Sequence, residues 1–151
     1  MALIWQARVF AGDMKQVFLI LIGPQVEESL FIHHKELSAA ERKARAIRAM
    51  KDVELPNAEE LYSCYPHELS GGEMQRFCIA RALGAHPSYL VADEVSTMLD
   101  AVTQAQIWRA LVAEAEARAM GLIFVSHSPA LASRLATRVV ELPAVPGAVR
   151  G

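Results

Sequence analysis

Cysteine, long hydrophobic runs and an excess of charge of one sign are all scarce in this chain. Its two cysteines, Cys64 and Cys78, form no metal-binding or redox spacing, and Cys78 stands in an apolar run that predicts a buried thiol. The strongest hydrophobic run, residues 17–22, is far shorter than the roughly 20 residues of a membrane-spanning helix. The net charge of −2 offers no electrostatic basis for nucleic acid or anionic lipid as the main partner. Any role at a membrane is therefore expected to depend on a partner protein.

Hydrophobic residues make up 53% of the 151 positions, which is enough for one domain with a substantial core. Apolar runs alternate with helix-like segments, and this alternation predicts an α/β domain with a mostly parallel sheet and flanking helices. Strands are expected at residues 3–10, 17–22, 89–92, 122–125 and 139–142. Helices are expected at residues 39–51, from 58 to about 62, from 71 to 83 or 84, at 101–120, and from 129 onward.

Helix starts are marked by the serine–glutamate spacing of a capping box at Ser38–Glu41 and at Ser70–Glu73. In such a box the serine hydroxyl accepts a hydrogen bond from the backbone of the glutamate, and the carboxylate accepts one from the backbone of the serine. Asn57 begins a similar pattern before the short helix expected near residue 60. These three positions define the expected starts of three helices.

Residues 69–76 read Leu-Ser-Gly-Gly-Glu-Met-Gln-Arg, so a serine and two glycines run into a helix-forming segment. Such a turn presents a hydroxyl and free backbone N–H groups at the positive end of a helix, which suits an anion such as phosphate. With Ile-Ala-Arg-Ala-Leu at 79–83, the octapeptide resembles the signature motif of ABC-type ATPases. The resemblance implies contact with the γ-phosphate of an ATP molecule that a partner subunit holds. The contacting residues would be Ser70, Gly71, Gly72 and Glu73.

An acidic pair, Asp93-Glu94, follows the strand expected at residues 89–92. At the carboxyl end of a buried parallel strand, one carboxylate can hold Mg²⁺ and another can orient and deprotonate water. The alternative is a solvated acidic loop. The pair begins 23 residues after Ser70, and at this distance it resembles the Walker B motif with its catalytic glutamate. The resemblance implies that Asp93 is the Mg²⁺ ligand and Glu94 the catalytic residue.

Two further positions have both a structural and a functional interpretation. Asp100 is predicted to cap the helix that follows it, and residues 96–100, Ser-Thr-Met-Leu-Asp, also resemble the D-loop of the ATPase dimer interface. His127 follows the strand expected at 122–125, where a lone histidine is usually structural or exposed. The surrounding Ser-His-Ser-Pro resembles the H-loop, which implies that His127 contacts the γ-phosphate and helps to position the attacking water.

The stretches at 65–72 and 92–108 are similar to those of the peptide and nickel importer branch of ABC ATPases. The resemblance covers roughly residues 16–142 and implies a partial P-loop NTPase (ABC ATPase) fold with a helical signature subdomain. It implies ATP and Mg²⁺ as cofactors, with a second ABC ATPase subunit and transmembrane permease subunits as partners. It also implies a cytoplasmic location, peripheral at the inner face of the cell membrane. An ABC-type DNA-repair or translation ATPase is disfavoured, since a basic surface and long coiled coils are lacking.

The phosphate-binding P-loop of that family, G-x-x-x-x-G-K-S/T, does not occur in the sequence. Its backbone N–H groups cradle the phosphates, its lysine neutralises them and its hydroxyl binds Mg²⁺. The sequence therefore predicts a truncated subunit that binds ATP weakly and does not hydrolyse it alone. The alternative is a non-enzymatic truncated or regulatory fragment that only occupies the ABC dimer interface. No lysine has the required neighbours; the four are Lys15, Lys35, Lys43 and Lys51.

The Q-loop also departs from the family pattern, in which an apolar strand runs into glutamine, an acidic residue and proline. When the prolines are aligned, Ile22 stands where the glutamine belongs. Gln25 is the candidate if the loop is shifted by three residues (22 + 3 = 25). The resemblance implies that this glutamine helps to bind Mg²⁺ and senses the membrane subunit.

These features divide the chain into four expected segments. Residues 1–24 would hold N-terminal strands and a degenerate Q-loop, and residues 25–86 a helical subdomain with the signature motif. Residues 87–142 would form the Walker B and H-loop half of the ATPase core, followed by a loose tail at 143–151.

Overall fold

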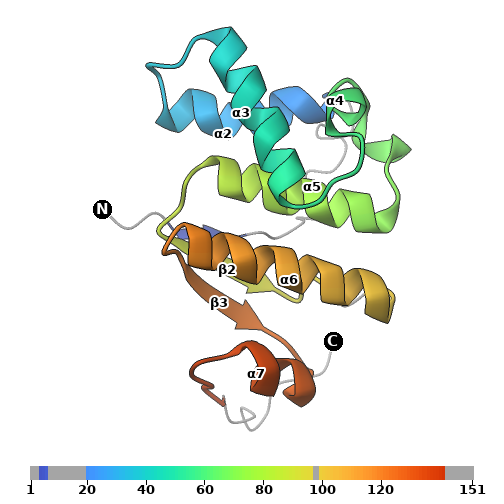
Figure 1. Ribbon diagram of the computed structural model, residues 1–151, viewed down its shortest axis with the longest axis vertical. Coiled ribbons are helices and arrows are strands. Elements are labelled where there is room, and N and C mark those ends of the chain that lie inside the picture. Colours follow the sequence, from blue (N-terminus) through green and yellow to red (C-terminus); the bar gives the residue numbers. More distant parts are fainter. Residues whose placement is uncertain (1–3, 7–19, 97–98, 142–151) are drawn as a thin grey trace, which may run out of the picture.

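The computed structural model describes residues 4–6, 20–96 and 99–141, which form helices and a small sheet (Figure 1). The helices α2 to α4 precede the signature helix α5, and α6 and α7 alternate with the last strands. The elements are β1 (Ile4–Gln6), α2 (Ile22–His33), α3 (Ala39–Asp52), α4 (Ala58–Leu61), a 3-10 helix η1 (Pro66–Glu68), α5 (Gly71–Gly84), β2 (Tyr89–Asp93), α6 (Ala101–Ala117), β3 (Gly121–Val125) and α7 (Pro129–Leu135).

The three strands form a parallel sheet in the order β1-β2-β3, which confirms the expected parallel α/β arrangement. Ile4 pairs with Tyr89 on one side of β2, and Tyr89 pairs with Gly121 on the other. The central strand β2 therefore pairs with both flanking strands, and the acidic pair lies at its carboxyl end.

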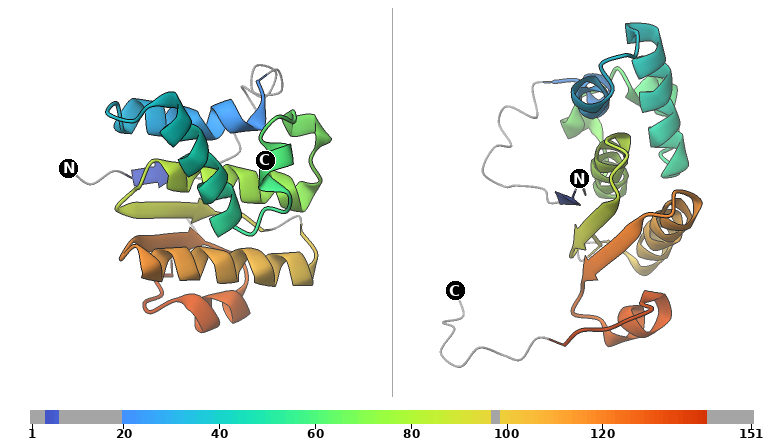
Figure 2. Two further views of the ribbon diagram at one scale, coloured as in Figure 1. Left: turned by 45° about the horizontal axis from the view of Figure 1, so that its top comes forward. Right: turned by 90° about the vertical axis from the view of Figure 1, so that its left-hand side faces the viewer.

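Helices α5 and α6 lie on one side of this sheet (Figure 2). Leu90 and Ala92 of β2 are fully buried on that side, and Phe124 of β3 packs against the same core. On the other side, Ile123 and Val125 are about half exposed, at 52% and 49%. Within the described part of the chain, the sheet is thus covered on a single face, although parallel sheets in compact domains are usually covered on both.

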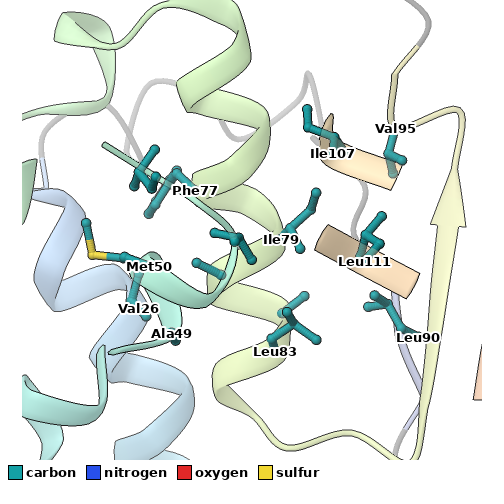
Figure 3. Packing of buried hydrophobic residues seen from close by; sticks show 14 of the residues in the cluster. Val26, Ala49, Met50, Phe77, Ile79, Leu83, Leu90, Val95, Ile107 and Leu111 are labelled. Carbon is teal, nitrogen blue, oxygen red and sulfur yellow. The ribbon is translucent and has the colours of Figure 1, made fainter. Parts of the chain in front are cut away.

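Helix α5 joins the sheet to an upper layer built from α2 and α3 (Figure 1). Phe77 points toward Met50 of α3, whereas Ile79 and Leu83 point toward α6 and β2 (Figure 3). Each such side chain contributes about 1.5–3 kcal/mol when it is fully buried. Because α5 is buried on two sides, its position relative to the sheet is well defined, and the signature motif at its amino end is placed with it.

The prediction of a strand at residues 17–22 is wrong for the part that the structure describes, because Ile22 begins helix α2. Ile22, Val26 and Leu30 recur at a spacing of four residues and are all at least 99% buried, which is the pattern of a helix face. Pro24 does not break this helix because it lies in the first turn, where a backbone N–H has no helical partner in any case. Residues 17–19 lie outside the described residues.

The strand expected at 139–142 is also wrong where it is described. Val139 and Val140 are 56% and 68% exposed and pair with no described strand. A β-rich run forms a strand only if a neighbouring strand accepts its backbone hydrogen bonds. Leu142 lies outside the described residues.

The other expected elements are confirmed within one to three residues, and 4–6 is the described part of the strand expected at 3–10. The short helix after Asn57 is present, but Asn57 has a left-handed φ of 48° and its side chain caps nothing. The two serine capping boxes, in contrast, are both formed. No helix within the described residues is long and apolar enough to cross a membrane.

Candidate functional site

The carboxyl ends of β2 and β3 and the amino ends of α5 and α6 all lie on the same side of the molecule, at the right in Figure 1. Asp93 and Val125 pair as the last residues of their strands, so the residues that follow them emerge at one edge. In open α/β sheets, the crevice beyond the carboxyl ends of the strands is the usual ligand site. Most of the residues that the sequence singled out lie at this edge.

Glu94 and His127 meet at this edge, with 2.7 Å between Glu94 Oε1 and His127 Nε2. Glu94 has a left-handed φ of 48°, and its backbone N–H donates to the carbonyl oxygen of Val125 at 3.2 Å. This turn holds Glu94 against the end of β3. The His127 side chain is 90% exposed and the Glu94 side chain 38%, so both are accessible. A carboxylate that is paired with an imidazole and open to water is suited to orienting a water molecule and accepting its proton.

Asp93 is the last residue of β2 and is partly buried beside this pair. The described residues contain no group of three histidine, cysteine or acidic side chains that could hold a metal ion. Mg²⁺ in nucleotide sites, however, is usually held by one or two carboxylates together with phosphate oxygens and water. Asp93 fits that pattern as a single protein ligand.

The signature motif forms the amino end of α5, where Ser70 is the N-cap. The Ser70 hydroxyl and backbone N–H bond Glu73 Oε2 at 2.6 and 2.9 Å, and the Glu73 backbone N–H donates to Ser70 Oγ at 3.4 Å. These bonds from Ser70 hold the pKa of Glu73 below its usual value. A methyl group on Gly71 would meet no other atom within 4 Å, so the backbone of this turn is open to an incoming group.

The amino ends of α5 and α6 touch each other through Gly72 and Thr103. A Cβ atom on Gly72 would lie 3.0 Å from Thr103 Cγ2, so a larger residue here would require the Thr103 side chain to shift. Asp100 caps α6, as predicted, by accepting bonds from the backbone N–H groups of Val102 and Thr103, both at 3.0 Å. The hydrogen bonds from Thr103 also lower the pKa of Asp100. The signature motif and Asp100 are thus brought together at one edge.

Two residues of α6 to which the sequence-based prediction gives no role, Gln104 and Trp108, hold Ser96 at the start of the expected D-loop. Ser96 is 95% buried, and its hydroxyl accepts bonds from Trp108 Nε1 at 3.0 Å and Gln104 Nε2 at 2.9 Å. Both donors come from α6. The spacing of four between Gln104 and Trp108 was the available signal, because it places them on one face of the expected helix.

Gln25 is not brought to this edge. It lies in α2, in the upper layer that α5 separates from the sheet (Figure 1). Its side chain is 95% buried, and Nε2 donates to the backbone oxygen of Ile20 at 2.7 Å. This contact supports the first turn of α2.

A different glutamine ends a strand of the sheet. Gln6 is the last residue of β1 and pairs with Val91, two residues before Asp93. An apolar strand that runs into glutamine is the pattern expected of a Q-loop, and Ile4-Trp5-Gln6 carries it in the sequence. The prediction overlooks it because Gln6 is not followed by an acidic residue and proline.

Comparison with known proteins gives the same family throughout. The sequence pattern of the ABC transporter family matches residues 8–97. The glutathione import ATP-binding protein GsiA of Escherichia coli K12 is 37% identical over an alignment of 143 residues, and the alignment covers 89% of this chain and 23% of GsiA. GsiA of Salmonella choleraesuis is 35% identical over 144 residues, with the same coverage. The chain thus spans about a quarter of the length of these curated relatives.

Solved structures of ABC cassettes share the fold. The dimeric bacterial ABC transporter cassette MJ0796 has a TM-score of 0.67 and 30% identity, over 79% of this chain and 52% of that one. The same cassette bound to ADP and phosphate after hydrolysis has a TM-score of 0.70 and 28% identity, over 85% of this chain and 54% of that one. A metal-chelate type ABC transporter has a TM-score of 0.70 at 21% identity, over 88% of this chain and 51% of that one, which shows the fold alone.

The predicted ABC ATPase fold is confirmed by these neighbours. The family pattern covers more than half of the chain and includes both the signature motif and the acidic pair. The chain therefore belongs to the ABC transporter family and is homologous to part of an importer's ATP-binding protein.

Proposed function

We propose that this chain is an ATP-binding subunit, or part of one, of an ABC importer for peptides or nickel, and that its signature motif acts on ATP held by a partner. The observation that carries this proposal is the open turn of Ser70 and Gly71 at the same edge as Glu94 and His127. The relatives' names support the peptide class, since glutathione is a peptide.

The acid–base residues of the proposed site are Glu94 and His127. Glu94 orients and deprotonates the attacking water, and His127 holds the Glu94 carboxylate through the 2.7 Å contact. Asp93 would hold Mg²⁺, which neutralises phosphate charge when it is bound. We assign the Q-loop role to Gln6 rather than Gln25, because Gln6 ends a strand beside β2.

The signature residues are proposed to act across a dimer interface. The free backbone N–H groups and the positive end of α5 favour a phosphate that approaches the Ser70 turn from outside. Asp100 lies next to this turn through the contact of Gly72 with Thr103, so the D-loop role at the same interface is consistent with its position. The second subunit and the transmembrane permease remain proposed partners.

The test is to mix the chain with an intact ABC cassette of the same branch and to measure ATP hydrolysis. Ser70→Ala is compared with Ser38→Ala, because Ser38 caps α3 with the same capping box and nearly the same distances. Both variants lose one helix cap, but only Ser70→Ala should lower the restored hydrolysis. The bulkier Ser70→Arg should abolish it. Equal activity of wild type and Ser70→Arg would refute action on the partner's ATP.

A second candidate is a non-enzymatic fragment that only occupies the dimer interface, which the missing P-loop lysine favours. It predicts no stimulation, or inhibition, of an intact cassette. Glu94→Gln tests this second candidate. ATP turnover in the mixture that falls by about 10²–10⁴-fold in this variant would need a general base from this chain and would rule out a non-enzymatic fragment.

A further inference from the structure

A groove with several arginine side chains lies between α3 and the carboxyl ends of α5 and α6, and its volume is about 220 Å³. We call it the arginine groove. Its floor is apolar, and its rim carries basic side chains with a single carboxylate. The residues that line it are Leu30, Ala49, Leu83 and Gly84 on the floor, and Arg45, Arg48, Asp52, His86 and Arg118 around the rim.

The helix period explains why these side chains converge. Arg45, Arg48 and Asp52 recur at spacings of three and four residues, so they share one face of α3. Arg118 follows the carboxyl end of α6, and its Nη1 donates to the backbone oxygen of Leu83 at 3.0 Å. The same carbonyl oxygen also accepts the backbone N–H of His86 at 3.0 Å, so this carbonyl at the end of α5, which would otherwise repel an anion, is satisfied.

The arginines outnumber the acidic side chains that neutralise them. Asp52 bonds Arg48 at 2.6 Å and also lies 3.6 Å from Arg118, and Glu114 bonds Arg118 at 2.6 Å. Arg45 forms no ion pair within the described part of the chain. Glu36 and Glu41 lie close enough to Arg45 for its charge to lower their pKa values, but both carboxylates are exposed and neither lines the groove. Among the described residues, Arg45 is therefore the rim arginine whose guanidinium binds no carboxylate directly.

Two histidines, His86 and His34, lie at the arginine groove or in contact with it. His86 has a left-handed φ of 49°, and its ring meets the ring of His34 edge-on at 5.3 Å. Partial burial lowers the pKa of His86, and the charges of Arg118, His34 and Arg45 lower it further. His34 Nε2 is buried and has no hydrogen-bond partner among the described residues. His34 Nδ1 lies 3.3 Å from Glu36 Oε1, so what is missing beside the His34 ring is a hydrogen-bonding group at Nε2.

The arginine groove is separate from the proposed ATPase site. It lies at the carboxyl end of α5, whereas the signature motif lies at the amino end. At 1.5 Å per residue, the 14 residues of α5 separate the two by about 20 Å.

We propose that the arginine groove is a second binding site, which takes a small anion with phosphate groups. Arg guanidinium groups match phosphate oxygens with paired N–H donors, and Arg45 is available for such a contact. The groove is smaller than the roughly 300–1,000 Å³ of sites for drug-sized ligands, which favours a compact anion over a whole nucleotide. The proposal does not depend on the ATPase function.

The experiment titrates the full chain with inorganic pyrophosphate at constant ionic strength, by calorimetry and by NMR of the histidine rings. Pyrophosphate should shift the ring signals of His86 and His34 and raise the pKa of His86. Arg45→Gln should weaken binding about tenfold, because it removes a charged hydrogen-bond donor. Arg109→Gln, which changes an exposed arginine of α6 outside the groove, should leave binding unchanged.

A second arm distinguishes a free phosphate from a lipid headgroup. Phosphatidylcholine vesicles with and without phosphatidic acid are offered to the same variants. Binding that needs phosphatidic acid and is lost in Arg45→Gln supports the groove as a headgroup site. The proposal is overturned if neither probe binds, or if Arg45→Gln and Arg109→Gln weaken binding equally.

Discussion

At the residue scale, Tyr62 anchors the amino end of α2. Its hydroxyl donates to the carboxylate of Glu27, and the ammonium group of Lys43 lies 4.8 Å from the centre of its ring. Its backbone oxygen also accepts the N–H of Gly23 at 2.9 Å, which satisfies one of the free donors at the helix start. Burial, followed by the hydrogen bond and the charge of Glu27, raises the pKa of Tyr62 to about 12.

The raised pKa predicts a loss of stability in strong alkali. Because the folded-state pKa exceeds the ordinary value of 10.0, the contribution of Tyr62 is complete below pH 10 and is lost as the pH rises through about 12. Ultraviolet titration of tyrosinate should show one tyrosine that ionises late. Tyr62→Phe should remove this late phase, and the exposed Tyr65→Phe should not. Three tyrosines that ionise together near their ordinary pKa would contradict the prediction.

Gly23 makes a second residue-scale prediction. A Cβ atom at Gly23 would lie 2.4 Å from the Tyr62 ring carbons Cδ2 and Cε2, and the ring is held by Glu27 and Lys43. Gly23→Ala should therefore lower the free energy of unfolding by about 1–3 kcal/mol. Gly71→Ala is the control, because its methyl group would meet no atom within 4 Å. Urea denaturation measures both, and an equal response at the two glycines would show that the ring moves aside.

At the element scale, α3 and α5 begin with the same serine–glutamate capping box. Ser38 and Ser70 have φ, ψ of −66°, 163° and −65°, 163°, and each accepts a bond from the glutamate three residues later. The two boxes are therefore expected to stabilise their helices equally, although only one belongs to the proposed site.

Ser38→Ala and Ser70→Ala should each cost about 1 kcal/mol of stability, the usual value for loss of an N-cap. Chemical denaturation of both variants measures this directly. Equal losses with unequal effects on restored ATP hydrolysis would assign a further role to Ser70. A much larger loss in one variant would mean that its serine has a structural partner that the other lacks.

At the scale of the whole molecule, the sheet face that no described helix covers is expected to influence solubility. Tyr89, Ile123 and Val125 are 45%, 52% and 49% exposed on neighbouring parallel strands. Contiguous apolar surface of this kind promotes association. The edge strand β3 also leaves backbone groups without a described partner strand.

Ile123→Thr should therefore reduce self-association without unfolding the chain, because threonine also favours β-strands. Ile32→Thr is a matched control, since Ile32 is 53% exposed on α2, away from the sheet. Analytical ultracentrifugation over a range of concentrations measures the effect. The same sedimentation behaviour in wild type and Ile123→Thr would exclude the sheet face as the associating surface.

Nucleotide affinity is a property of the whole molecule too, because a P-loop and the acidic pair act together. The sequence has no G-x-x-x-x-G-K-S/T, so the chain alone should bind ATP weakly, with little change on adding Mg²⁺. Equilibrium binding with and without Mg²⁺ measures this. Tight, Mg²⁺-dependent ATP binding that Asp93→Asn abolishes would contradict this prediction, because it would show that other residues bind the phosphates in place of a P-loop.

The sequence by itself determined the local features of this protein. The serine capping boxes, the cap at Asp100 and the spacing of the apolar residues on α6 depend on residues a few positions apart. Such contacts form within one element, so a pattern along the chain predicts them directly. The signature motif and the acidic pair belong to this class, and they were sufficient to identify the family.

Only the tertiary structure decided which residues meet. Glu94 and His127 follow different strands, β2 and β3, and Gln6 lies in the sheet because β1 pairs with β2 rather than because of its neighbours in the chain. The apolar run at residues 17–22 predicted a strand, but the burial of Ile22, Val26 and Leu30 against α3 and α5 makes Ile22 the first residue of a helix. The physical reason is the same in each case: burial and strand pairing act between segments that are distant in sequence, and they outweigh local propensity.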